Sequence, residues 1–120
     1  MNVRAIRGAI QIDADTPSLM QEAVTELMTT IMENNSLASS DLISVLFTCT
    51  PDLVSDFPAA SARAMGLGAV PLLCAVEMAV PASLPRTIRV MVHCVTARSQ
   101  AEISHTYLRG ATVLRRDLAQ

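Results

Sequence analysis

Hydrophobic residues alternate with other residue types along residues 2–12, the first segment of the chain. The isoleucines of this segment fall on one face of an extended chain, and they are Ile6, Ile10 and Ile12. Arg7 falls on the opposite face, where its neighbours Ala5 and Ala9 are small and leave room for a ligand. The pattern predicts a strand with one apolar face and an arginine on the other.

The spacing of the hydrophobic residues then changes to three and four, which is the period of an amphipathic helix. The residues that keep this spacing are Leu19, Met20, Ala23, Val24, Leu27, Met28 and Ile31. Thr16 and Pro17 form a favourable start, because threonine caps a first turn and proline fits the first helical position. We expect a helix from there to about Glu33, closed by Asn34 and Asn35.

Residues 42–95 are predicted to hold three strands and one short helix. The strands are expected at 42–49, 69–75 and 86–95, and the helix at 57–65, where Gly66 and Gly68 stop it. The apolar face of the last strand consists of alternate residues, namely Ile88, Val90, Val92 and Cys94. Arg89 therefore lies on the opposite face of its strand, as Arg7 does in the first one.

The C-terminal part begins with a capping box, in which Ser99 is followed three residues later by Glu102. It predicts a helix in which Ile103 and Tyr107 share a face and which Gly110 ends. The order of elements is then strand, helix, strand, helix, strand, strand, helix. We expect an α+β fold in a single domain, residues 1–120, with a mixed sheet and the helices on one side.

Composition and charge narrow the classes of function. Hydrophobic residues make up 51% of the 120 residues and aromatic residues only 2%, which is more aliphatic side chain than one small core needs and favours a homo-oligomer. The net charge is −2 and no basic run occurs, so nucleic-acid binding is not expected. No apolar run approaches the ~18 residues of a membrane span. Three cysteines without metal-binding spacing fit the reducing cytoplasm.

The basic residues carry the first indication of a ligand, because all nine are arginine. A guanidinium on a strand needs an anion or water, and its planar fork suits a carboxylate. Arg7 and Arg89, on the non-core faces of two strands, therefore suggest a pocket for a small polyanion. The competing interpretation is that each is an ordinary surface arginine that reaches solvent.

No standard catalytic signature accompanies these arginines. His93 and His105 are isolated and are interpreted as structural or exposed. Glu77 ends an apolar run, so it is either half of a structural pair with an arginine or a ligand contact. Cys74 has no histidine near it in sequence and is interpreted as a structural thiol. In a regular strand Cys74 and Glu77 face opposite ways, so both can line one pocket only if the strand ends or bulges near Val76.

Five segments, taken together and in this order, resemble the trimeric AroH class of chorismate mutases, which is distinct from the all-helical class. They are residues 3–9 (VRAIRGA), 50–53 with 57–63 (TPDL and FPAASAR), 74–78 (CAVEM), 84–90 (LPRTIRV) and 105–111 with 114–115 (HTYLRGA and LR). The resemblance runs from Arg4 to Leu118. It implies a homotrimer with a pseudo α/β-barrel arrangement and three active sites at subunit interfaces.

The resemblance also implies an isomerase that converts chorismate to prephenate in phenylalanine and tyrosine biosynthesis, without a cofactor. This reaction is an intramolecular Claisen rearrangement, which accounts for the missing nucleophile and base, and the two carboxylates of chorismate account for the arginines. Matching motif positions implies that Arg89 donates to the ether oxygen and a carboxylate. Arg7 and Tyr107 would hold carboxylates, and Glu77 would accept from the ring hydroxyl, with Cys74 beside it as a polar contact.

The remaining residues that the resemblance places at the substrate are Phe57, Ala59, Arg63, Leu73, Leu114 and Arg115. Phe57 and Arg63 would come from across the subunit boundary, and Leu114 with Arg115 belongs to a tail that orders over the ligand. The chain departs from the family pattern at Ala60, Leu73, Val76 and Arg116. The alternatives are a non-catalytic trimeric module that binds a small carboxylate, and an imine or enamine hydrolase of the Rid type.

Overall fold

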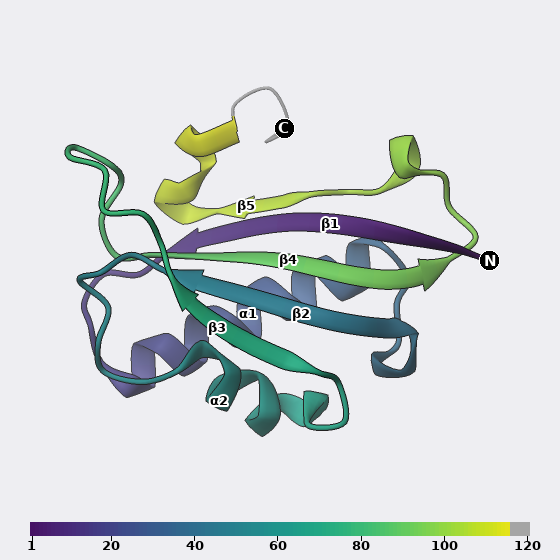
Figure 1. The fold of residues 1–120 in the computed structure, drawn as a ribbon, viewed down its shortest axis with the longest axis horizontal. Coiled ribbons are helices and arrows are strands. Elements are labelled where there is room, and N and C mark those ends of the chain that lie inside the picture. The colour runs from purple at the N-terminus through teal and green to yellow at the C-terminus, as the bar shows by residue number, and fades with distance from the viewer. Residues whose placement is uncertain (116–120) are drawn as a thin grey trace.

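A computed structural model of the chain describes residues 1–115 (Figure 1). The strands are β1 (Asn2–Gln11), β2 (Leu42–Cys49), β3 (Leu72–Val76), β4 (Thr87–Thr96) and β5 (Thr106–Leu108). The α-helices are α1 (Pro17–Asn34) and α2 (Pro58–Ala62), and a π-helical turn, Arg63–Leu67, continues α2. Short 3-10 helices occupy Ser39–Asp41, Gln100–Glu102 and Arg109–Arg115. The expected α+β class with a mixed sheet is confirmed.

The five strands form one sheet in the order β3-β2-β4-β1-β5. β4 lies in the middle and is antiparallel to both of its neighbours, β1 and β2, while the two outer pairs, β2 with β3 and β1 with β5, are parallel. The helices α1 and α2 cover the same face of this sheet (Figure 1). The expectation of helices on one side is therefore confirmed for these two α-helices.

The core lies between the sheet and the two helices. Helix α1 begins as the sequence predicts, since Thr16 accepts a 3.1 Å hydrogen bond from the Leu19 N–H. Its apolar stripe, from Met20 to Ile31, is buried against the sheet. At the end of α1 the buried Asn35 donates to the carbonyls of Ile31 and Ser104, which ties the helix to the segment before β5.

The predicted C-terminal helix is wrong. The capping box of Ser99 and Glu102 does form, but it opens only the three-residue 3-10 helix Gln100–Glu102. The chain then extends into β5, in which Tyr107 pairs with Ala9 of β1. A free strand edge on β1 offers hydrogen-bond partners that a local sequence pattern does not reveal, so tertiary pairing overrides the helix signal.

The segment 77–86, between β3 and β4, is held at its base by polar contacts to the end of β2. The Asp52 carboxylate accepts a hydrogen bond from the backbone N–H of Arg86 at 3.0 Å, and Thr50 Oγ1 accepts one from the Thr87 N–H at 3.0 Å. Arg86 adopts a left-handed conformation, with φ of 49°, and its side chain donates to the Ile12 carbonyl. These contacts fix where β4 begins, two residues before Arg89.

Candidate active site

A row of paired residues crosses the sheet on the face that α1 and α2 leave uncovered. The strand register aligns them as Tyr107, Ala9, Arg89, Thr48 and Ala75, one from each strand from β5 to β3. The alternation of side chains places all five on one face. Ala9 itself is fully buried, so the open space on this face does not lie directly above it.

Arg7 joins this row as a diagonal neighbour of Arg89, because it pairs with Met91 in the β1–β4 register. Arg7, Arg89, Tyr107 and Thr48 line one hollow of about 230 Å³. The sequence-based expectation that two strands direct arginines from the non-core face is confirmed. Two guanidinium groups and a phenol in one hollow form a site suited to an anion with more than one carboxylate.

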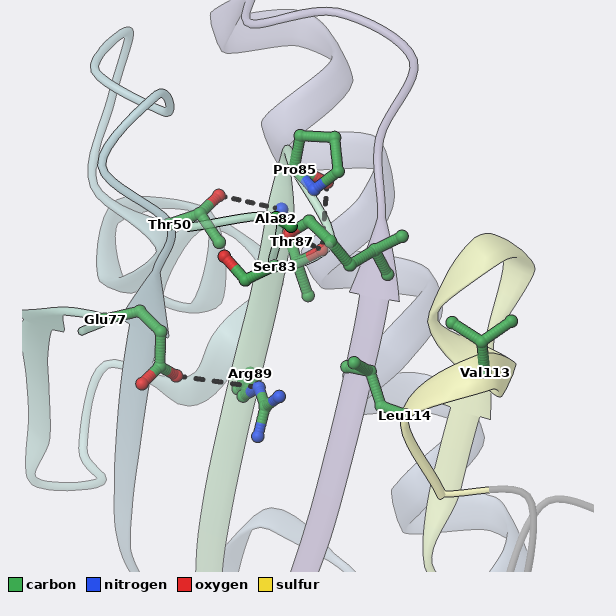
Figure 2. Close-up of a pocket in the computed structure, with 10 residues that line it drawn as sticks. Thr50, Glu77, Ala82, Ser83, Pro85, Thr87, Arg89, Val113 and Leu114 are labelled. Atoms are coloured by element: carbon green, nitrogen blue, oxygen red, sulfur yellow. Dashed lines mark hydrogen bonds and ion pairs between the residues drawn. The ribbon is translucent and has the colours of Figure 1, made fainter. Parts of the chain in front are cut away.

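Arg89 also lines a second and larger hollow of about 440 Å³, shown in Figure 2. Glu77 lies on one side of this hollow, with its carboxylate directed toward Arg89. Leu114 and Val113, from the 3-10 helix after β5, line another side. Arg89 lines both hollows and therefore lies between them.

Glu77 follows the last residue of β3, so the strand does end at Val76, as a shared pocket would require. Its Oε2 accepts a 3.0 Å hydrogen bond from Thr48 Oγ1 and lies 3.5 Å from Arg89 Nε. The Glu77 backbone N–H donates to the Cys49 carbonyl at 2.8 Å, which extends the strand pairing by one residue. One bond to its carboxylate and one from its backbone therefore hold Glu77 beside Arg89.

Cys74 does not share the hollow that Glu77 lines. It pairs with the buried Phe47 in the β2–β3 register, and it lines a separate hollow of about 320 Å³ together with Phe57 and Cys49. Burial, with the nearby Cys74 and the carboxylates of Asp15 and Asp52, raises the pKa of Cys49 to about 12, so this thiol is neutral at physiological pH. Within one chain, Phe57 and Cys74 thus lie apart from Arg7 and Arg89.

The other residues implied by the resemblance are dispersed over the single chain. Ala59 is buried in α2, and Arg63 is exposed in the turn that follows. Leu73 is exposed on β3 and pairs with Leu46, so it shares the face of the arginine site. Arg115 is half-buried at the end of the described residues. Arg116, where the sequence departs from the family pattern, lies outside the described residues, as does the tail beyond it.

His105 supports the arginine site from the edge of β1. Its Nδ1 accepts a 2.9 Å hydrogen bond from the backbone N–H of Arg7. Burial, with contributions from the Arg7 and Arg115 charges, lowers the pKa of His105 below its usual 6.5 and favours the neutral ring that this bond needs. The interpretation of His105 as structural agrees with this placement.

Sequence reasoning missed Thr48, which contacts Glu77 and lines the hollow of Arg7 and Arg89. The alternation of side chains along a strand could have identified it, because Thr48 stands between Phe47 and Cys49 and must face away from them. The polar contacts of Asp52 with Arg86 were also missed, and no local pattern predicts them.

Comparison with known proteins agrees with this arrangement. A family model described as chorismate mutase type I matches residues 3–118. The chain belongs to the type I chorismate mutase family. A chorismate mutase AroH from Thermus thermophilus is 48% identical over 117 residues, covering 97% of this chain and 96% of the relative. One from Bacillus subtilis is 38% identical over 120 residues, covering 99% of this chain and 94% of the relative.

A solved structure of a chorismate mutase from Clostridium thermocellum has the same fold, with a TM-score of 0.89. It is 41% identical in sequence, and the match covers 91% of this chain and 97% of that one. The resemblance identified from the sequence is therefore confirmed, and with it the isomerase class. Among residues 1–115 no three His, Cys, Asp or Glu side chains gather in a way that could hold a metal ion, and no helix there is long and apolar enough to cross a membrane.

Proposed function

We propose that this protein rearranges chorismate to prephenate at the hollows that share Arg89. The single observation that carries the proposal is the convergence of Arg7, Arg89 and Glu77 on the uncovered sheet face, two cations and one carboxylate drawn from three strands or their ends. Chorismate matches this set, because it has two carboxylates for the arginines and a ring hydroxyl for the glutamate. Membership of the family supports the same substrate.

The reaction needs no acid, base or nucleophile from the protein. In the Claisen rearrangement the ether C–O bond breaks while a C–C bond forms, and the electrons move in a ring within one molecule. The protein has to select the compact substrate conformer and stabilise negative charge that develops on the ether oxygen. Arg89 is suited to this second task, because its side chain is half-exposed and lines both hollows.

Arg7 and Tyr107 hold substrate carboxylates in this proposal, since both line the smaller hollow with Arg89. Glu77 accepts from the ring hydroxyl and so selects the orientation in which the ether oxygen faces Arg89. Leu114 covers the opposite side of the larger hollow and, with Arg115, forms the start of a segment that closes over the ligand.

The active protein is a homotrimer in which each site lies at a subunit interface. Large hydrophobic side chains are exposed on the single chain, among them Phe57, Leu73, Val76 and Met78. Burial of such a surface against other copies is strongly favourable. Phe57, Arg63 and Cys74 then reach a neighbouring subunit's arginine site, which reconciles their separation from Arg7 and Arg89 within one chain, while the buried Ala59 supports Phe57 from α2. We place this trimer in the cytoplasm.

The decisive experiment is to follow loss of chorismate absorbance with purified protein and to confirm prephenate through its acid conversion to phenylpyruvate. Arg89→Ala should lower kcat by about 10²- to 10³-fold, because it removes a donor to the developing charge. Arg4→Ala is the matched control, since Arg4 lies on the same strand as Arg7 but bonds only to backbone carbonyls among its described contacts. Folded wild-type protein that binds chorismate without turnover would instead support a carboxylate-binding module.

A further inference from the structure

Thr48 occupies the centre of the site without belonging to any of the segments that carry the family resemblance. It lies in β2, and the register pairs it with Arg89 on one side and Ala75 on the other. Its hydroxyl donates a 3.0 Å hydrogen bond to Glu77 Oε2. Thr48 is thus bonded to one proposed substrate contact and adjacent to another.

The two oxygens of the Glu77 carboxylate have different partners. Oε2 accepts from Thr48 and lies 3.5 Å from Arg89 Nε, whereas Oε1 accepts only a 3.2 Å bond from the Met78 N–H among the described contacts. A carboxylate oxygen has two lone pairs, so Oε1 retains capacity for another donor. The Thr48 bond therefore decides which oxygen remains available to a ligand.

The distance between Glu77 and Arg89 shows that their pairing is incomplete. A charge-assisted hydrogen bond between such groups has a length of about 2.7–2.9 Å, well below the 3.5 Å found here. The Arg89 side chain is half-exposed and the Glu77 side chain is 30% exposed. Ion pairs between such exposed side chains hold a carboxylate only weakly. The hydroxyl of Thr48, which is paired on both sides within the sheet and has a restricted χ1, is the firmer anchor.

We propose that Thr48 is a positioning residue, which orients the Glu77 carboxylate toward the ring hydroxyl of the substrate and keeps it from pairing fully with Arg89. This inference rests on the proposed function, because it assigns a support to two of its substrate contacts. Without the hydroxyl, the carboxylate is free to move onto the guanidinium. Glu77 then loses its orientation, and Arg89 offers fewer donors to the substrate.

Kinetics of two substitutions test the role. Thr48→Val removes the hydroxyl and keeps the shape, and we expect kcat/KM to fall roughly tenfold, the scale of one hydrogen bond to a charged group. Thr48→Ser keeps the hydroxyl and should retain activity within about threefold. Both variants should melt within a few degrees of the wild type. Unchanged kcat/KM in Thr48→Val would overturn the proposal.

A double-mutant cycle separates a role through Glu77 from a general structural one. In a Glu77→Ala background, where no side-chain acceptor remains for the Thr48 hydroxyl, adding Thr48→Val should change kcat/KM by less than about twofold. A tenfold loss that persists in this background would show that Thr48 acts by another route and would also overturn the proposal.

A crystal structure of Thr48→Val tests the positioning without depending on the reaction. We expect a Glu77 carboxylate oxygen within about 3 Å of a guanidinium nitrogen of Arg89, the length of a full charge-assisted bond. A carboxylate that stays where the wild type holds it would refute the positioning role. Absence of turnover by the wild type would refute the proposed function instead, and this structure would still decide the role of Thr48.

Discussion

The two faces of the five-stranded sheet use the same strands for different purposes. The face under α1 and α2 carries isoleucine, valine and phenylalanine side chains that are fully buried. The uncovered face carries Arg7, Arg89 and Thr48, which remain partly accessible in the single chain. Because side chains alternate along a strand, each residue of the proposed site has residues of the covered face as immediate neighbours. The core face thereby fixes the backbone positions from which the site is built.

Stability and activity should therefore depend on opposite faces of the sheet. Substitutions on the covered face should lower the free energy of unfolding, while folded molecules still turn over substrate. Substitutions on the uncovered face, such as Arg89→Ala and Thr48→Val, should lower turnover and leave the free energy of unfolding nearly unchanged. Unfolding must be compared at one protein concentration if the chain is a trimer, because association stabilises the folded state.

Phe47→Ala should have the largest effect on the covered face. Phe47 is 0% exposed and stands next to Thr48 on β2. Its truncation leaves a cavity, and we expect a loss of about 3–5 kcal/mol in the free energy of unfolding, measured by urea denaturation. Phe47→Leu, the control, keeps most of the volume and should cost much less. If Phe47→Ala lost little free energy of unfolding but the folded protein were inactive, the two faces would not have separate roles.

Gly8→Ala should have an intermediate effect, because the covered face has no space for a side chain at this position. A Cβ on Gly8 would lie 2.8 Å from Ile31 Cδ1 and 3.1 Å from the Thr106 carbonyl oxygen. Such overpacking typically costs about 1–3 kcal/mol, observable in the same denaturation experiment. Gly68→Ala is the matched control, since no atom lies within 4 Å of a Cβ there. Equal stability of the two variants would contradict this account of the packing.

The smallest effect should come from pH. Burial lowers the pKa of His105 in the folded protein, so the unfolded chain takes up this proton more readily than the folded chain does. Stability should therefore decrease as pH falls below about 6.5, the usual histidine value, until the folded pKa is passed. Thermal melts from pH 8 to pH 5 measure this slope. His105→Asn, which keeps an acceptor and does not titrate, should flatten it, and an unchanged slope would exclude His105 as its source.

The kinetic counterpart is a kcat that stays nearly constant across neutral pH. In the proposed rearrangement no group of the protein gains or loses a proton, so kcat should vary by less than about threefold between pH 6 and 9. A bell-shaped profile with two pKa values near 7 would contradict the pericyclic mechanism.

Local patterns predicted most of the elements because they record burial directly. The three- and four-residue spacing before Asn35 indicated α1, and alternation around Arg89 indicated β4 and the direction of its side chain. The segment after Glu102 was mistaken for a helix because its capping box is a local signal, while the hydrogen bonds that β5 makes belong to a distant strand.

The sequence by itself determined which face each residue occupies, since side-chain direction in a strand follows from position alone. It therefore assigned Arg7 and Arg89 to the non-core faces of their strands. Only the tertiary structure decided that β1 and β4 are neighbours, in a register that makes the two arginines diagonal partners. The tertiary structure also decided that Thr48 bonds to Glu77, and that Cys74 lines a different hollow from Glu77. These outcomes depend on strand order and register, which arise from packing between residues far apart in the chain.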